Sequence, residues 1–476
     1  MAAEDVASYD ELLALVQAQQ QQLAAQAALI EDLQSQIAEL KRRLGLNSRN
    51  SSKPPSSDGL AKPAPRSLRK ASGRKPGKQP GAPGVSLSLI DDPHQTLVHR
   101  PEHCSGCRQS LAGAAVAGVI RRQVIGLAPA RRQVTEHQIV SCACVCGTRT
   151  SAAAPAGVNA VVQYGSDVAA VVTYLCVAQH LPVARIVQIL TDLLGCPVST
   201  GWIATVLHRT ATALTGFRTR LFDALGRATV INFDETGARV NAGLRWVHVA
   251  CTPQLTSYHL DGKRGQAAID NHGVLPAMTG RIAVHDGWLP YRKRCYDHVE
   301  HALCNVHHLR ELTGWAETGE HHMWATPLMT LLREGHTRVR EASTAGHHRL
   351  PDTVLNNLHH RWQHAITTAY TLNPPPPGKG RGSVLALIDR LRGFHTEIWR
   401  FATDFRVPFD NNQAERDIRM VKLQPKISGA WRTEHGARTW LQIREYISTC
   451  RKNNIPTLQA LHDALTGNPW LPPLPE

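Results

Sequence analysis

VPFDNNQAERDIRMVK, at residues 407–422, is the stretch of sequence that best indicates how this chain folds. Asn411 and Asn412 are expected to cap a helix, because an Asn side chain accepts hydrogen bonds from the unpaired N–H groups of a first turn. Apolar side chains then recur on one face of that helix at about 100° per residue, and this face should pack on a core. They are Ala414, Ile418 and Val421.

Glu415 lies on the flank of this apolar face, together with Arg419 and Lys422. A carboxylate next to two cations, at the rim of a buried helix, suits a metal ion and phosphates. An ordinary salt-bridged helix shows the same pattern. Whether Glu415 is catalytic therefore depends on partners elsewhere in the chain.

The composition bounds the class of protein. At 476 residues the chain exceeds a single core, so about two to four domains are expected. Lys and Arg outnumber Asp and Glu by 53 to 38 and the pI is near 9.6, which favours nucleic acid as a partner, or a basic tail. No apolar run is long enough to cross a bilayer and the acidic start is unlike a signal peptide, which predicts a cytoplasmic location. In that compartment, clustered cysteines indicate metal ligands rather than a disulfide framework.

The first two segments are expected to mediate association and tethering. Residues 9–46 repeat apolar residues every seven positions, with Gln19 and Gln26 among the companion positions, which predicts a coiled coil for oligomerisation. A lone amphipathic helix packed on the body is the alternative. Residues 47–93 form a basic, disordered linker, which favours contacts to DNA phosphates without base readout. The linker cations expected to contact DNA are Lys70, Arg74, Lys75 and Lys78.

Residues 94–158 contain two cysteine clusters, HCSGC and CACVCG. A CxxC turn followed by a second close-spaced cysteine pair predicts a zinc-binding module with one structural Zn²⁺. Two metal-free surface turns are the alternative. Residues 119–140, between the clusters, alternate like two strands of a small ribbon. The expected ligands are Cys104, Cys107, Cys144 and Cys146, with Cys142 or His103 as a substitute.

The central region changes from helices to strands. Residues 159–225 are helical and compatible with a helix-turn-helix DNA-binding domain, although generic helical packing fits equally well. Residues 226–306 show three antiparallel strands, a helix and further strands of a mixed sheet, the order of a ribonuclease-H-like fold. Asp234 and Asp286 each end a buried strand. If these strands are neighbours, both carboxylates emerge at one edge of the sheet, where oxygen ligands hold two hard cations.

The rest of the chain is predicted to be helical. Residues 307–402 form an insertion, residues 403–430 bring the helix of Glu415 back to the strand core, and residues 431–476 are a C-terminal helical region. The predicted fold class is therefore multidomain α+β. It has a ribonuclease-H-like catalytic core, a helical insertion, an N-terminal coiled coil and a small zinc-binding module.

Three motifs resemble a known family. Asp234 in NFDET, Asp286 in VHDGW and Glu415 in DNNQAERDIR, with a helical block between the last two, resemble the Asp-Asp-Glu (DDE) transposases of the insertion-sequence-sixty-six family. The resemblance covers nearly the whole chain, including the NSSKPPS tether and the cysteine clusters. Cys304 and His307 also resemble a short Cys/His signature of such enzymes. The second cysteine cluster departs from the family, because it has three cysteines where two are expected.

The resemblance implies a DNA transposase of a bacterial insertion sequence, with two Mg²⁺ or Mn²⁺ ions held by Asp234, Asp286 and Glu415. Asp234 would bridge both ions. Such an enzyme binds terminal inverted repeats, hydrolyses phosphodiester bonds at the element ends and joins the 3′-hydroxyls to target DNA. The resemblance also implies accessory proteins of the same element and association with the nucleoid. The helix cations expected to contact the DNA backbone are Arg416, Arg419 and Lys422.

Two other functions and several other residues compete with this interpretation. A metal-dependent nuclease without joining activity is one alternative function, and a non-catalytic zinc-containing DNA-binding regulator is the other. Glu235 should point to the opposite strand face from Asp234, as a supporting or surface acid. Asp410 fits a turn ahead of the helix cap, and Asp417 lies on the opposite flank of the helix. The remaining candidates are expected to be structural. Cys304 should be a buried cysteine and His307 a residue at a helix start, with a metal role as the alternative for both. Trp288 and Trp431 should pack in a core, with stacking on flipped bases as the alternative.

Overall fold

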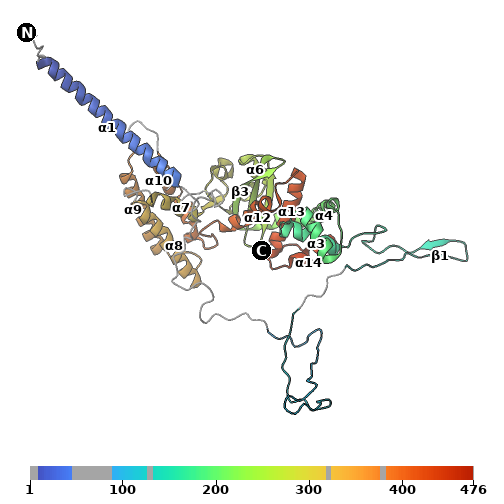
Figure 1. Cartoon of the computed structure of the whole chain (residues 1–476). Helices are drawn as coiled ribbons and strands as arrows, with labels where there is room; N and C mark the ends of the chain where they lie inside the picture. The colour runs from blue at the N-terminus through green and yellow to red at the C-terminus, as the bar shows by residue number, and fades with distance from the viewer. Residues whose placement is uncertain (1–8, 46–87, 126–131, 318–322, 376–381, 475–476) are drawn as a thin grey trace, which may run out of the picture. The chain divides into compact units, whose positions relative to one another are not determined.

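The computed structural model of the chain describes residues 9–45, 88–125, 132–317, 323–375 and 382–474 (Figure 1). Most of the predicted linker, including Lys70, Arg74, Lys75 and Lys78, lies outside these ranges. No helix within them is long and apolar enough to span a membrane.

The chain divides into two compact units. The first comprises Met1–Arg66, His137–Gln188 and Pro197–Glu476, and the second comprises Ser67–Glu136 and Ile189–Cys196. The first unit begins with the single helix α1 (Tyr9–Gly45), which covers the predicted heptad segment. Its apolar heptad side chains are exposed, as expected for a helix whose partner would be another chain: Val16, Leu23, Ile30, Ile37 and Leu44.

A mixed five-stranded sheet, in the order β5-β4-β3-β6-β7, organises the first unit. Strands β3 (Val230–Val240), β4 (Gly243–Cys251) and β5 (Thr256–Asp261) form an antiparallel meander, whereas β6 (Ile282–His285) runs parallel to β3 and β7 (Glu300–Leu303) parallel to β6. Helix α6 (Gln266–His272) lies between β5 and β6 in the chain. The mixed α/β architecture and the succession of strands agree with the sequence prediction.

The length of β3 corrects that prediction. The strand does not end at Asp234 but continues to Val240, and its second half pairs with β4. Asn241 and Ala242 make the two-residue turn, both with positive φ (48° and 61°), as tight hairpins with the sheet's own twist require. The weak turn signal of these two residues hid the hairpin in the sequence.

Helices α12 (Asn412–Ser428) and α13 (Glu434–Lys452) pack on the sheet, α12 against β3 and β4 and α13 against β5 (Figure 1). The buried face of α12 carries Ala414, Ile418 and Val421, as expected. The α-helices before β3 in the described part of the chain, apart from α1, are α2 (Ser166–Thr173), α3 (Val183–Leu194), α4 (Thr200–Ala213) and α5 (Thr215–Arg227), and α14 (Thr457–Leu465) follows α13. Helices α4 and α14 pack on α13. The Ser199 hydroxyl accepts a hydrogen bond from Trp202 N at 3.1 Å and caps α4, as predicted.

Five helices follow β7 and form a second core. They are α7 (Asn305–Ala316), α8 (Ala325–Thr344), α9 (Asp352–Leu372), α10 (Ser383–Gly393) and α11 (His395–Thr403). Trp362 and Trp399 are almost completely buried there, with ring centroids 5.6 Å apart in an edge-on arrangement. The same cluster includes Val284 of β6 and Leu303 of β7, so this core is continuous with the β6–β7 edge of the sheet.

The predicted ribbon at residues 119–140 is wrong for the residues that the structure describes. The only strands near the cysteines are β1 (Ser141–Ala143) and β2 (Arg149–Ser151), which flank the second cluster, and neither 119–125 nor 132–140 forms a strand. Apolar side chains here, such as Ile120 and Val124, are 85% and 97% exposed. The alternating pattern therefore has no core on which a ribbon could be stabilised.

Candidate active site

Asp234 and Asp286 lie where two parallel strands separate. The β3–β6 ladder runs from Val230 opposite Ile282 to Asn232 opposite Val284, and each aspartate follows two residues later on its own strand. Strand β6 ends at His285, whereas β3 continues beside β4 alone. The two aspartates therefore occupy matching positions at one edge of the sheet, as the sequence predicted for neighbouring strands.

Negative charge accumulates around Asp234. Burial, followed by the charges of Glu235, Asp286 and Glu415, raises the pKa of Asp234 to about 8. Its Oδ1 accepts a hydrogen bond from Glu235 N at 2.9 Å, and Asp286 Oδ1 accepts one from Trp288 N at the same distance. Like charges held close in a desolvated place favour the neutral carboxyl, and a divalent cation would reverse that preference. The physical chemistry of this edge therefore suits bound cations.

Glu415 reaches the site from the first turn of α12. Asn411 occupies the N-cap position, as predicted, but its side chain does not cap the helix. Instead, Asn411 Nδ2 donates to the Phe233 carbonyl at 2.7 Å and Asn411 Oδ1 accepts from Asn232 Nδ2 at 2.8 Å. Asn411 thus joins the start of α12 to β3, beside Asp234.

The prediction for Asn412 is also corrected. Asn412 is the first residue of α12, and its backbone N–H donates to Asp410 Oδ1 at 2.9 Å. Asp410 therefore forms the turn ahead of the helix, as expected. Asn411 does not cap α12, because its side chain is buried (1% exposed) and its amide forms hydrogen bonds with β3 instead.

Asp417, which competed with Glu415, and Glu235, the neighbour of Asp234, have structural partners. Asp417 Oδ2 accepts from Lys452 Nζ at 2.6 Å and from Thr256 Oγ1 at 3.1 Å. Glu235 is 9% exposed, so the surface alternative is wrong for this residue. Its carboxylate accepts from Arg264 at 2.6 and 2.9 Å and from the Tyr291 hydroxyl at 2.6 Å.

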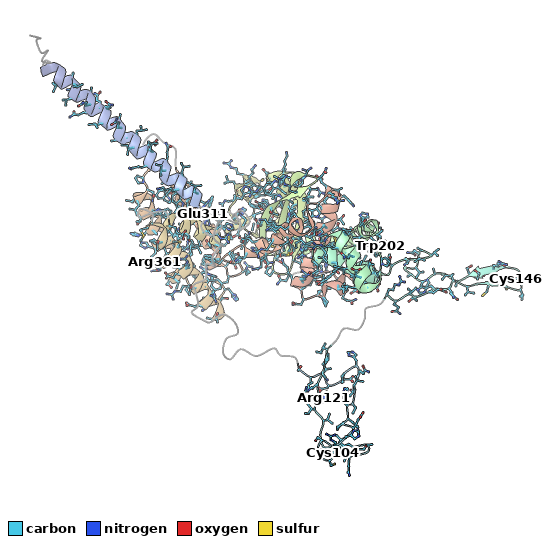
Figure 2. The ribbon with its side chains drawn as sticks, viewed as in Figure 1. Cys104, Arg121, Cys146, Trp202, Glu311 and Arg361 are labelled. Atoms are coloured by element: carbon cyan, nitrogen blue, oxygen red, sulfur yellow. The ribbon has the colours of Figure 1, made fainter. Side chains whose placement is uncertain are left out.

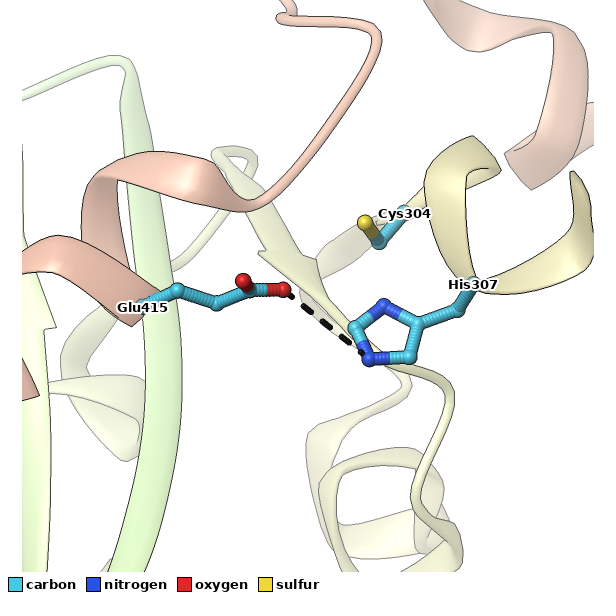
Figure 3. A group of neighbouring side chains, drawn as sticks. All are labelled: Cys304, His307 and Glu415. Atoms are coloured by element: carbon cyan, nitrogen blue, oxygen red, sulfur yellow. Dashed lines mark ion pairs between the residues drawn. The ribbon is translucent and has the colours of Figure 1, made fainter. Parts of the chain in front are cut away.

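Cys304 and His307 stand at the start of α7, directly across from Glu415 (Figure 3). Cys304 is 1% exposed, as expected of a buried cysteine, and its Sγ accepts from Asn411 N at 3.2 Å. His307 Nε2 lies 4.0 Å from Glu415 Oε1. Among the described residues, the group whose metal-binding atoms all lie within 4.8 Å of one another is Cys304, His307 and Glu415, rather than Glu415 with the two aspartates. Nothing in the sequence linked the Cys/His pair to Glu415, because more than a hundred residues separate them.

The remaining predicted residues near the site divide into exposed cations and packed aromatics. Arg416 and Arg419 are exposed on α12, and Lys422 is half-buried. Trp431 is 8% exposed and packs on Trp440, as expected. The Trp288 ring faces the Arg264 guanidinium at 4.2 Å and the edge of Tyr291, so it too is held by packing.

The two cysteine clusters form similar tight turns. Arg108 N donates to Cys104 O and Gly147 N donates to Cys144 O, both at 2.9 Å, and each of these donors has a positive φ (62° and 86°). The second turn joins β1 to β2, with Cys146 labelled in Figure 2. A hydrogen bond with Thr148 lowers the pKa of Cys146 to about 7, which favours a thiolate at neutral pH.

Cys142 differs from the other cysteines of the second cluster. It lies within β1, paired with Thr150, rather than in the turn. Cys144 and Cys146 are therefore the better placed members of that cluster. The clusters fall in different units of the chain, and the four-cysteine zinc site stays a prediction.

Comparison with known protein families assigns the chain to a family. The model described as "Transposase IS66 family" matches residues 161–439, which is more than half of the chain and includes Asp234, Asp286 and Glu415. The chain belongs to the IS66 transposase family. The resemblance predicted from the sequence is thereby confirmed.

Two further similarities were found for this IS66-family chain. A model described as "Family of unknown function (DUF6444)" matches residues 4–88, the heptad segment and most of the linker. The curated protein "Uncharacterized protein y4qI" of Sinorhizobium fredii (strain NBRC 101917 / NGR234) is 37% identical over 67 residues. That match covers 14% of this chain and 12% of the relative's length, so the relative says little about the whole protein.

Proposed function

We propose that this IS66-family protein is a DDE transposase, which cuts phosphodiester bonds at the terminal inverted repeats of a bacterial insertion sequence and joins the freed 3′-hydroxyls to target DNA. One observation carries the proposal. Asp234 and Asp286 occupy matching positions on adjacent parallel strands, and Glu415 is close enough to raise the pKa of Asp234. The strand order β5-β4-β3-β6-β7, with three antiparallel strands first, supports a ribonuclease-H-like catalytic core.

The acids fit a pair of Mg²⁺ or Mn²⁺ ions. The charges of Glu235, Asp286 and Glu415 all act on Asp234, which supports bound cations at this position. Bound ions would activate the attacking oxygen and stabilise the leaving one. Asp234 would bridge the two positions, with Asp286 and Glu415 each holding one. The rigid strands and the Asn411 contact to β3 keep these carboxylates oriented before DNA arrives.

Other parts of the chain would bind DNA and assemble the protein. Arg416, Arg419 and Lys422 of α12 would contact the phosphate backbone, and Lys70, Arg74, Lys75 and Lys78 would add contacts from the linker. Cys104, Cys107, Cys144 and Cys146 would bind one structural Zn²⁺, because close-spaced cysteine pairs are typical zinc ligands. Helix α1 would pair with a second copy through its exposed heptad face.

Labelled inverted-repeat DNA, incubated with the protein, target plasmid and Mg²⁺ or Mn²⁺, tests the proposal. We expect both cleavage and joining, and we expect Asp286→Ala and Glu415→Ala to abolish both. Glu341→Ala, an exposed acid of α8, is the matched control and should be active. Joined products that persist in the Asp286 or Glu415 variants would refute the three-acid mechanism. Cleavage without joining would favour the nuclease, and DNA binding without either reaction would favour the regulator.

A further inference from the structure

Three side chains from two helices converge on one small space in Figure 3. Cys304 precedes α7, His307 belongs to its first turn, and Glu415 comes from the first turn of α12. Their Sγ, imidazole nitrogen and carboxylate oxygen all lie within 4.8 Å of one another. A thiol, an imidazole and a carboxylate are the three protein ligand types that Zn²⁺ accepts.

The spacing of these atoms is wrong for a direct hydrogen bond but right for an ion. His307 Nε2 and Glu415 Oε1 are 4.0 Å apart, beyond hydrogen-bonding distance. Two ligand atoms of one tetrahedral Zn²⁺ lie about 3.3–3.8 Å apart, since each is about 2.0–2.3 Å from the metal. A shift of a few tenths of an ångström in either side chain therefore places both in the coordination shell of one ion.

The hydrogen bonding supports the same conclusion. Glu415 Oε1 is buried and makes no hydrogen bond with the described residues. A buried carboxylate oxygen without a partner costs free energy, and a bound cation would remove that cost. Cys304 Sγ accepts the Asn411 N–H at 3.2 Å, which holds the sulfur close to Glu415 and His307. A cation bound between these three groups would therefore be favourable.

We infer that Cys304, His307 and Glu415 form a site for a Zn²⁺-type divalent ion, distinct from the position between Asp234 and Asp286. Thiolate and imidazole ligands select Zn²⁺ over Mg²⁺, which takes oxygen ligands. Glu415 is shared with the acid site of the proposed function, but Cys304 and His307 are not. The Glu415 and His307 side chains are 29% and 16% exposed, so the ion would have three protein ligands and one side open to solvent. It would also tie α7 to α12.

Titration of the full-length, metal-free protein with Co²⁺ tests the site, because Co²⁺ replaces Zn²⁺ and absorbs visible light when bound by sulfur and nitrogen. The signal of the cysteine clusters is common to all variants. We expect Cys304→Ser, His307→Gln and Glu415→Gln each to lose one bound Co²⁺, or to bind it more than about tenfold more weakly. His360→Gln, an exposed histidine of α9, is the matched control and should bind as the unmodified chain does.

A second readout and a second variant separate the outcomes. Binding should release one proton fewer in Cys304→Ser, because the thiol must lose its proton to bind the metal. Asp234→Asn should retain the Co²⁺ ion even if it is inactive on DNA, which distinguishes this site from the proposed catalytic ions. An unchanged Co²⁺ affinity in His307→Gln would overturn the inference. Loss of the ion in Asp234→Asn would overturn it as well, since the ion would then belong to the aspartates.

Discussion

Replacing Asn411 by Ala should separate the start of α12 from β3, beside Asp234. Asn411 is 1% exposed and donates to Phe233 O at 2.7 Å, while its Oδ1 accepts from Asn232 Nδ2 at 2.8 Å. Both partners belong to β3, directly before Asp234. Ala cannot replace either bond, so a backbone carbonyl and a side-chain amide would remain buried without partners.

The size of the effect follows from those two groups. A buried donor or acceptor left without its partner costs about 1–3 kcal/mol, so the loss of two partners in Asn411→Ala should lower the free energy of unfolding by about 2–6 kcal/mol. Asn412→Ala, one residue later on α12, should change it by less than about 0.5 kcal/mol. The pair Asn232 and Asn411 should show a coupling energy of about 1 kcal/mol, because each singly truncated variant already breaks their shared bond.

Urea unfolding, followed by tryptophan fluorescence, measures these values for Asn411→Ala, Asn232→Ala, the double variant and Asn412→Ala. DNA cleavage by the same proteins reports whether Glu415 is still positioned. An Asn411→Ala protein within about 0.5 kcal/mol of the unmodified chain, with no coupling to Asn232, would refute the role assigned to this side chain.

Three further predictions concern other parts of the chain. Gly335→Ala should destabilise the protein by about 1–3 kcal/mol in thermal or urea unfolding, because the new Cβ would lie 2.6 Å from Trp399 Cζ3 in a filled core. Gly393→Ala is the control, because no atom lies within 4 Å of its new Cβ. Equal losses of stability in the two variants would contradict the packing argument. Burial raises the pKa of Glu445 to about 7, above its unfolded value, so Glu445 makes stability fall as pH rises from about 4.5 to 7. Glu445→Gln should reduce that fall by up to about 1.4 kcal/mol per pH unit in urea unfolding, and an unchanged slope would show that Glu445 does not carry it. Ile30→Lys on α1 should abolish self-association in size-exclusion chromatography with light scattering, because Ile30 belongs to the apolar heptad face. Ala28→Lys on the outer face should not. An oligomer that survives Ile30→Lys would rule out the coiled coil.

Local signals in the sequence were enough to place most elements. The run of β-branched residues before Asp234, the alternation from Leu244 to Thr252 and the Pro253-Gln254 turn predicted β3, β4 and β5, because side-chain period and turn residues act within a few positions. The apolar face of α12 was predicted for the same reason. The positions of Asp234 and Asp286 at one sheet edge required only that their strands be neighbours, which the parallel β3–β6 ladder satisfies.

Local signals also misled where the partner was distant. Asn411 has the sequence context of a helix cap, yet its amide bonds to β3, about 180 residues earlier in the chain. The ribbon predicted at residues 119–140 has the right alternation but no core to cover. A side chain with two available roles takes the one that packing offers, and packing is absent from a local pattern.

The sequence by itself determined which residue types the chain carries to the sheet edge: two aspartates after apolar runs, a glutamate on a helix, and a basic flank. Only the tertiary structure decided which side chains contact or surround these acids. It buried Glu235 against Arg264 and Tyr291, engaged Asp417 with Lys452, and set Cys304 and His307 opposite Glu415. Periodicity reports which face of an element is apolar, because that depends on residues within one or two turns. Which polar groups then meet depends on how whole elements pack, and that is settled by contacts between residues of different elements, from 29 to more than a hundred positions apart.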